Sequence, residues 1–290
     1  MCTTLILVGI ELRLCVGTIK IKKMNYDKYL KICRDLYKDD KPPLNEFYSD
    51  PVKRIPIEEF SKNYMNSVNF ISEKVKSYFD QNPTTEIMNW YPNFLHFENE
   101  MEIMCQELVP WLEKNTYGCH LFVDKIYIYR TAEMQSRESS YKWHYDNNPE
   151  EIVKNIVYLN DVNDKNSPFE YLQDPEGKGV IFEATRKGTD DWTNAPNDSR
   201  LDNEVDYLIK NGYKSFRVLG PKGTTYSFSN DAGHRANPVI EGYRDVINIR
   251  VKPTTTKPPT YINKKWTTDN KISGTVNPDP EKDCNYYDKL

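Results

Sequence analysis

Short runs of alternating polar and apolar residues, rich in Tyr, Val, Ile and Phe, fill the chain from about residue 119 to residue 252 and constrain the fold more than any other feature. Alternation with a period of two is typical of half-buried β-strands, and turn sequences separate the runs at residues 174–177, 220–223 and 230–233. Many short strands in succession favour a barrel or a sandwich. We expect strands at residues 120–131, 141–145, 154–160, 169–172, 179–184, 215–219, 224–229 and 243–252.

The first part of the chain carries a helical period instead. Apolar residues recur at spacings of three and four in residues 25–38, in a segment that begins at Pro56 and ends at residues 82–83, and in residues 98–114. A further helical pattern covers residues 201–210. We therefore expect a layer of helices beside the β-structure.

Charge and composition exclude several classes of protein. The 290 residues include 39 Lys and Arg against 43 Asp and Glu, so the positive charge of a nucleic-acid-binding protein is missing and we expect no nucleic-acid partner. No apolar stretch reaches the length of about 18 residues that a membrane span needs. The six cysteines form no CxxC pair, which favours a reducing, cytoplasmic setting.

The sequence is expected to form one domain with a flanking segment on each side. We expect residues 1–23 to be an appendage without a convincing signal-peptide pattern, and residues 253–290, rich in Thr, Lys and Pro, to form an extended tail. Residues 24–252 form the expected domain, with a helical layer over 24–118 and a β-structured core over 119–252. The polar segment 185–200 is expected either to close over a site, with Trp192 or Arg186 against the substrate, or to be a solvated surface loop.

Two of the four histidines stand in sequence contexts that favour a metal. His144 and Asp146 are two residues apart in an expected strand, so their side chains point to the same face. His234 follows the turn at 230–233 and precedes the last expected strand. Two imidazoles and one carboxylate on one face of an octahedron form the ligand set of non-haem Fe(II) oxygenases. Arg244 begins the last strand, where a guanidinium can grip a carboxylate with two hydrogen bonds.

Each of these residues also has a structural interpretation. His144 and Asp146 would then be a solvent-facing strand pair, and His234 a turn histidine hydrogen-bonded to Asp231. Arg250 shares a strand face with Arg244 and is an alternative carboxylate binder. His96 and His120 are expected to be structural. Cys119 beside His120 is not a nucleophile pair, because adjacent strand residues face opposite ways.

Four segments stand in a characteristic order: Trp143-His144-Tyr145-Asp146-Asn147-Asn148-Pro149, residues 155–160, Gly233-His234-Arg235-Ala236 and Gly242-Tyr243-Arg244. Together they resemble the 2-oxoglutarate- and Fe(II)-dependent dioxygenases, nearest to their phytanoyl-CoA hydroxylase-like branch. The resemblance covers residues 119–252 and implies a mainly β fold, a double-stranded β-helix (a jelly-roll or cupin-like barrel) preceded by N-terminal helices.

The resemblance also implies a chemistry for these residues. It gives His144, Asp146 and His234 as the Fe(II) ligands and Arg244 as the residue that holds the distal carboxylate of 2-oxoglutarate, with O2 as the second co-substrate. Many members of the branch have a Ser two residues after the distal His, where this chain has Ala236. A second hydrogen bond to the carboxylate is then expected from Tyr127 or Tyr129 on the first strand.

The sequence therefore predicts an Fe(II)- and 2-oxoglutarate-dependent oxygenase that hydroxylates a small molecule or a side chain of another molecule and releases succinate and CO2. Two alternatives use the same fold. One is a non-catalytic cupin-like barrel that binds a metal or small ligand, and the other is a hydrolase or isomerase barrel with zinc or manganese. Arg244 separates the oxygenase from the binding barrel, which has no need of a buried clamp for a dicarboxylate. Metal analysis of protein purified without oxygen addresses the hydrolase or isomerase. Neither the substrate nor the oligomeric state can be predicted from the sequence.

Overall fold

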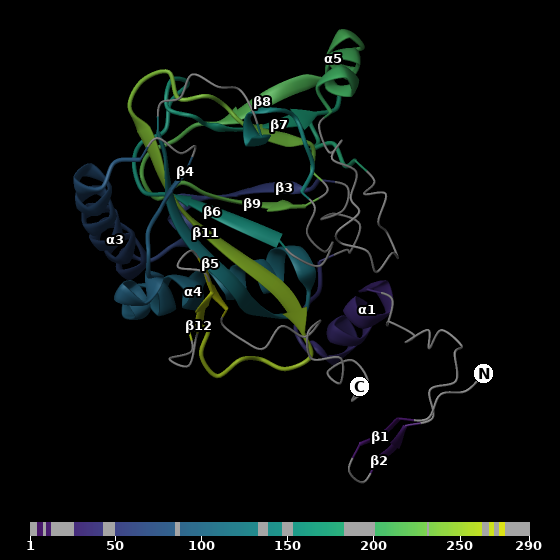
Figure 1. Cartoon of the computed structure of the whole chain (residues 1–290). Coiled ribbons are helices and arrows are strands. Elements are labelled where there is room, and N and C mark those ends of the chain that lie inside the picture. The colour runs from purple at the N-terminus through teal and green to yellow at the C-terminus, as the bar shows by residue number, and fades with distance from the viewer. Residues whose placement is uncertain are drawn as a thin grey trace.

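Two antiparallel β-sheets form the body of the protein in a computed structural model (Figure 1). The structure describes residues 5–7, 10–12, 26–42, 50–84, 88–132, 139–146, 153–182, 201–230, 232–262, 267–269 and 273–275. The larger sheet has the order β12 (Thr267–Asp269), β13 (Ser273–Thr275), β5 (His120–Ala132), β11 (Tyr243–Thr254), β6 (Val153–Tyr158), β9 (Thr225–Ser229) and β3 (Val52–Ile55), and β4 (Met88–Trp90) also pairs with β5. The smaller sheet has the order β10 (His234–Ala236), β7 (Phe169–Gln173) and β8 (Lys214–Val218), while β1 (Leu5–Leu7) pairs with β2 (Ile10–Leu12).

The space between the sheets is filled by aromatic and branched side chains from both of them. Strand β6 shows how the period of two divides its residues, because Ile156 and Tyr158 join this inner cluster while Val153 and Val157 belong to the core under the helices. Phe169 of β7 packs against Tyr226 and Phe228 of β9, with ring centroids 4.7 Å apart in both pairs. The two sheets therefore enclose one core, in the manner of a jelly roll.

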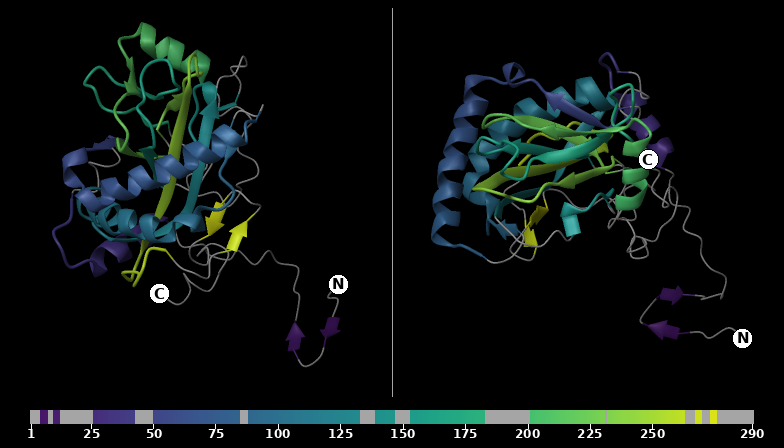
Figure 2. Two further views of the ribbon diagram at one scale, coloured as in Figure 1. Left: turned by 90° about the vertical axis from the view of Figure 1, so that its left-hand side faces the viewer. Right: turned by 90° about the horizontal axis from the view of Figure 1, so that it is seen from above.

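Helices cover the outer face of the larger sheet (Figures 1 and 2). They are α1 (Tyr26–Leu36), α3 (Lys62–Gln81) and α4 (Glu98–Leu112), and α4 continues into a π-helical turn at Glu113–Tyr117. The apolar stripe of α3 is buried, with Val68, Ile71 and Val75 fully inaccessible. Ser61 begins α3 as an N-cap, since its hydroxyl accepts hydrogen bonds from two backbone N–H groups of the first turn.

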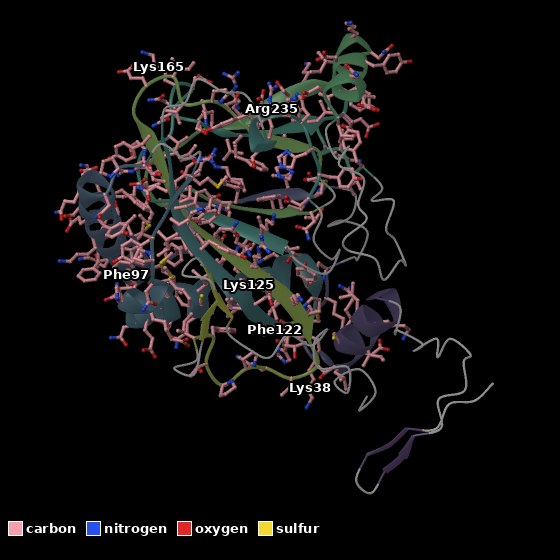
Figure 3. The ribbon with its side chains drawn as sticks, in the orientation of Figure 1. Lys38, Phe97, Phe122, Lys125, Lys165 and Arg235 are labelled. Atoms are coloured by element: carbon pink, nitrogen blue, oxygen red, sulfur yellow. The ribbon has the colours of Figure 1, made fainter. Side chains whose placement is uncertain are left out.

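A buried ion pair fastens the helical layer to the sheet. Arg130 of β5 donates two hydrogen bonds to Asp245 of β11, at 2.6 and 2.7 Å, and a third at 2.7 Å to Asp80 near the end of α3. The guanidinium also lies 3.8 Å from the ring centroid of Tyr243. Figure 3 shows Phe97 among the helices and Arg235 on the smaller sheet, at the opposite side of the larger sheet.

Helix α5 (Asp202–Lys210) leads into β8 and supports the smaller sheet. Val205 of α5 and the preceding Leu201 pack with Trp143, Tyr145 and Leu172 in a third apolar cluster. Asp202 accepts a hydrogen bond from the backbone N–H of Trp143 at 2.9 Å, and the backbone N–H of Leu201 donates to the carbonyl of Trp143 at 2.7 Å. The segment around Trp143 is therefore held at both its side chain and its backbone.

The expected fold class is confirmed: the protein is mainly β, with jelly-roll-like sheets and a helical layer that precedes them. Two expected strands were wrong. Residues 139–141 form a 3-10 turn, after which only His144 makes a β-bridge. Between residues 179 and 182 only Gly179 and Ile181 make isolated bridges. The short strands β3, β4 and β10 were not expected.

Two sequence predictions concern parts of the chain that the structure covers partly or not at all. The segment 185–200, with Arg186 and Trp192, lies outside the described residues. The second prediction is the extended tail at residues 253–290, of which Tyr261 and Ile262 are buried in the core that includes the helices. In the described part of the chain no helix is both long and apolar enough to cross a bilayer.

Candidate metal centre

His144 and His234 lie directly opposite each other at the edge of the smaller sheet. The backbone N–H of each histidine donates to the carbonyl of the other, at 2.9 Å in both directions. Directly paired residues of antiparallel strands point to the same face, and the two imidazole centroids are 4.4 Å apart. The backbone pairing alone therefore brings two residues that are 90 positions apart in the sequence into one site.

Both imidazoles are held in the same tautomer by a carbonyl two residues earlier. Nδ1 of His144 lies 2.8 Å from the carbonyl oxygen of Lys142, and Nδ1 of His234 lies 2.8 Å from that of Ala232. A carbonyl oxygen only accepts, so each Nδ1 carries the proton and donates. Each Nε2 then presents its lone pair in the neutral imidazole, which is how metal-binding histidines are usually oriented.

Asp146 completes the cluster. One carboxylate oxygen lies 4.0 Å from Nε2 of His144, and the other lies 3.5 Å from Nε2 of His234. The three ligand atoms that face one another all lie within 4.8 Å. With metal–ligand bonds of roughly 2.1 Å, adjacent octahedral ligands stand roughly 3 Å apart, so small side-chain adjustments would bring these atoms around one ion.

Lys154 of β6 is a cation at this cluster, and its ammonium lies 2.6 Å from Asp146. Burial raises the pKa of Asp146, but the opposing effects of Lys154, which is charged and donates a hydrogen bond to the carboxylate, and of the two nearby imidazoles outweigh it, so the carboxyl pKa is lowered overall. Burial lowers the pKa of Lys154 to about 8, against the opposing effect of Asp146. Asp146 is therefore ionised at neutral pH, in the form that can bind a metal.

The local sequence around His234 explains its placement. A Cβ at Gly233 would overlap the ring of Phe182, so a larger residue immediately before the histidine would require that ring to move. The rings of Phe228 and Phe169 lie 4.8 and 5.3 Å from the imidazole of His234. These aromatic neighbours give the cluster a dry side, which strengthens its electrostatic interactions.

The cluster opens into a cavity of about 380 Å³ between the two sheets. Its described wall contains three cationic side chains, two histidines, one carboxylate and a group of aromatic residues. The lining residues are Met88, Trp90, Tyr127, Tyr129, Ser140, His144, Asp146, Lys154, Ile156, Phe169, Tyr226, Phe228, His234, Ala236, Arg244, Asn248 and Arg250.

Arg244 lies at one end of this cavity and is 4% exposed. It pairs in register with Thr131 of β5, whose hydroxyl oxygen is 3.5 Å from Nη2. Among the described residues, Nε of Arg244 has no hydrogen-bond partner. A buried guanidinium with an unsatisfied donor is costly, and it suits an anion bound in the cavity.

Tyr129, Tyr127 and Arg250 lie progressively further from Arg244 along the cavity. Tyr129 is opposite Val246 and Tyr127 is opposite Asn248, so both tyrosines share the cavity face with Arg244. The guanidinium carbon of Arg250 lies 4.8 Å from the ring centroid of Tyr127. The shared face of Arg244 and Arg250 is as the strand period predicted.

The other two histidines lie away from this cavity. Nδ1 of His96 is 3.2 Å from the hydroxyl of Tyr91, and Nδ1 of His120 is 3.4 Å from Glu113. Cys119 is fully buried, and burial raises its pKa well above the usual value. These contacts support the structural interpretation of His96 and His120.

Sequence reasoning missed Lys154 and Thr131. A lysine at the start of a strand usually reaches solvent, and only closure of the barrel places Lys154 beside Asp146. Thr131 could have been predicted as a candidate, because it lies two residues beyond Tyr129 and therefore on the same strand face.

Comparison with known proteins gives structural neighbours but no family. No family model matches the chain, and no curated protein matches it. Among solved structures, HygX from Streptomyces hygroscopicus with nickel and 2-oxoglutarate bound is 14% identical, with a TM-score of 0.47 over 76% of this chain and 89% of that one.

Two further structures match at a similar level. The non-heme alpha ketoglutarate dependent epimerase SnoN from nogalamycin biosynthesis is 10% identical, with a TM-score of 0.49 over 80% of this chain and 87% of that one. EctD from S. alaskensis with bound Fe is 13% identical, with a TM-score of 0.47 over 77% and 82% of the two chains. Because proteins of one fold can have many functions, the chemistry of this chain is decided by its own side chains.

Proposed function

We propose that the protein is an Fe(II)- and 2-oxoglutarate-dependent oxygenase. The observation that carries this proposal is that one cavity contains both a His–Asp–His cluster and the buried guanidinium of Arg244. The cluster matches the two-histidine, one-carboxylate ligand set of non-haem iron oxygenases. The guanidinium matches a co-substrate that carries a carboxylate remote from the metal.

Each of these residues has a defined task in the proposed reaction. His144 and His234 offer Nε2 lone pairs, and Asp146 offers one oxygen while Lys154 holds the carboxylate in place. Arg244 orients the co-substrate, and the hydroxyl of Thr131, 3.5 Å from its Nη2, can assist it. When bound, Fe(II) and 2-oxoglutarate supply the oxidising chemistry, in which O2 is consumed and succinate and CO2 are released. Phe169 and Phe228 limit the access of water to the metal ligands.

Arg244 also separates this proposal from its two rivals. A metal-binding barrel without activity gains nothing from a buried guanidinium with an unsatisfied donor. A zinc or manganese hydrolase or isomerase could use the three ligands, but it needs no dicarboxylate co-substrate. Metal content after purification without oxygen, together with a requirement for 2-oxoglutarate, distinguishes the three functions.

We also propose a finer assignment: a hydroxylase of the phytanoyl-CoA hydroxylase-like branch that acts on a small molecule or a side chain in the cytoplasm and binds no nucleic acid. The branch assignment is supported by the order and spacing of the motifs at 143–149, 233–236 and 242–244. The reducing compartment is supported by Cys33, Cys105 and Cys119, which are buried and form no disulfide bond among the described residues.

The test is the formation of succinate from 2-oxoglutarate by the protein with Fe(II) and O2, screened against a library of candidate substrates. Succinate should form only when Fe(II), O2 and 2-oxoglutarate are all present, and Zn(II) should not replace Fe(II). His234→Ala should abolish this turnover, whereas the matched control His96→Ala should retain it because His96 contacts Tyr91 outside the cavity. Undiminished succinate formation by the His234→Ala protein would contradict the assignment.

A further inference from the structure

A second guanidinium lines the cavity in addition to Arg244. Arg250 lies on the same face of β11, six residues further on, which is about 20 Å along an extended strand. It is partly exposed, in contrast to the buried Arg244. The ring of Tyr127 lies 4.8 Å from its guanidinium carbon and supports it from one side.

Lys154 is the direct cross-strand partner of Arg250 in the pairing of β6 with β11. Two like charges in directly opposite positions destabilise a sheet, and Lys154 is only 6% exposed. The fold therefore accepts an electrostatic cost to place two cations together in the wall of the cavity.

Charge balance indicates what these cations are for. Among the described residues of the cavity wall, Asp146 is the single carboxylate. With the proposed function in place, a divalent metal, Asp146, doubly charged 2-oxoglutarate and Arg244 sum to zero formal charge. Lys154 and Arg250 then add two positive charges to a cavity that is already neutral.

An aromatic surface lines the cavity wall between Arg244 and Arg250. Trp90 of β4 is opposite Tyr129, and its ring centroid lies 5.1 Å from that of Tyr129 and 5.9 Å from that of Tyr127, the ring that supports Arg250. Met88 is opposite Thr131, towards the Arg244 end of the same wall. The side chains of Trp90, Tyr127 and Met88 are partly buried rather than enclosed. A flat or apolar group can pack there while a charged group reaches Arg250.

We propose that the substrate is an organic anion, whose carboxylate or phosphate group is bound by Arg250 with help from Lys154, and whose apolar part packs against Trp90. This inference rests on the proposed function only for the reaction that follows, because the anion site itself consists of residues of this chain. Arg250 provides a planar pair of donors that fits both carboxylate and phosphate. Lys154 keeps further N–H donors beyond the one that it gives to Asp146.

The test is calorimetric titration of the full chain loaded with Zn(II) and 2-oxoglutarate, a combination without redox turnover. The probes are phenyl phosphate and benzoate, with benzyl alcohol and benzylamine as neutral and cationic controls of similar shape. The anions should bind at least tenfold more tightly than benzyl alcohol, and benzylamine should bind most weakly. Comparison of phenyl phosphate with benzoate identifies which anionic group the site prefers.

Three variants show whether Arg250 is responsible. Arg250→Gln should weaken anion binding at least tenfold, leave benzyl alcohol unchanged and leave the affinity for 2-oxoglutarate within about twofold. Arg250→Lys keeps the charge and should retain part of the anion binding, which also covers the case in which the Gln variant does not fold. Arg217→Gln is the matched control, because Arg217 lies on β8, pairs with Asp164 and does not line the cavity.

The two proposals can fail separately in this experiment. Equal affinity for anions and benzyl alcohol, or anion binding unchanged in Arg250→Gln, would overturn the anion site. Loss of 2-oxoglutarate binding in Arg250→Gln would also overturn it, because Arg250 would then serve the co-substrate. If Zn(II)-loaded protein binds no 2-oxoglutarate at all but still binds the anions through Arg250, the proposed function fails and the anion site stands.

Discussion

Replacing Arg244 by Met should weaken the binding of 2-oxoglutarate and, at the same time, raise the stability of the protein without ligands. Arg244 is 4% exposed, and its described contacts include a long one, at 3.5 Å, from Nη2 to the hydroxyl of Thr131. Its Nε has no partner among the described residues. The guanidinium is therefore placed to bind a ligand and lowers the stability of the protein without one. The substitution should lower the affinity for 2-oxoglutarate and raise the stability of the unliganded protein.

The magnitudes follow from these contacts. A bound carboxylate would gain two charge-assisted hydrogen bonds from Arg244, each worth about 1.5–3 kcal/mol. Their loss corresponds to a Kd for 2-oxoglutarate that is at least about 100-fold higher. Removing a buried polar group that lacks a full set of partners should recover about 1–3 kcal/mol of folding free energy, which raises Tm by about 2 °C or more for a domain of this size.

Calorimetric titration of 2-oxoglutarate into Zn(II)-loaded protein and thermal unfolding of the metal-free protein measure the two effects. Arg217→Met is the control, because Arg217 is 41% exposed and bound to Asp164, so its loss should leave the affinity unchanged. A lower Tm together with weaker binding would indicate that Arg244 is part of the structural framework. Unchanged binding in Arg244→Met, with a large loss in Arg250→Met, would refute the assignment of the co-substrate end of the cavity.

Three other substitutions test separate parts of the structure. Lys154→Met removes a positive charge 2.6 Å from Asp146, so Zn(II) should bind more tightly, with a Kd about tenfold lower in competition with a chelating dye. Weaker binding of Zn(II) would mean that Lys154 matters more for orienting the carboxylate than for its charge. Burial raises the pKa of Glu113 above its usual value, so ionisation of this carboxyl lowers the stability of the folded protein as pH rises through the raised pKa. Glu113→Gln should therefore raise Tm at pH 7 but not at pH 4. An equal rise at both pH values would contradict the pKa shift. Met104→Ala leaves a cavity in the fully buried helical core and should lower the free energy of unfolding, measured with a chemical denaturant, by about 2–5 kcal/mol without changing the affinity for 2-oxoglutarate. A loss below about 1 kcal/mol would show that the core can collapse around the cavity.

The elements with long, regular patterns could be predicted from the sequence. The stripe of α3, with Val68, Ile71 and Val75, has the period of a helix and is buried as expected. Strands β5 and β11 are long enough for their alternation to be clear. By contrast β10 has three residues and β4 has three, which is too short for any period to be read, and both depend on pairing with distant strands.

The segment around His144 shows why local pattern was not sufficient. Residues 141–145 alternate like a strand, but the chain enters through a 3-10 turn and makes one bridge, His144 with His234. The side of this segment that faces the cavity was still predicted, because Trp143 and Tyr145 pack into the cluster at α5. Asp146 is directed by its ion pair with Lys154 of β6, a contact that no sequence pattern contains.

The candidate site could be predicted only in part, because some of its residues belong to sequence motifs and others depend on contacts between distant parts of the chain. His144, Asp146, His234 and Arg244 belong to recognisable motifs, and the structure brings them to one cavity. The hydroxyl opposite Arg244 comes from Thr131, which depends on the register of β5 with β11. That register is set by the whole sheet, so the sequence could give candidates on the same strand face but not the one in direct contact.

The absorption spectrum of the full chain under anaerobic conditions tests the central claim most directly. When Fe(II) and 2-oxoglutarate are added together, chelation of the metal by the co-substrate should give a weak visible charge-transfer band that neither component gives alone. The band should be absent in His234→Ala and should need a much higher concentration of 2-oxoglutarate in Arg244→Met. A wild-type protein that binds Fe(II) but gives no such band at saturating 2-oxoglutarate would contradict the proposal that this cavity holds both.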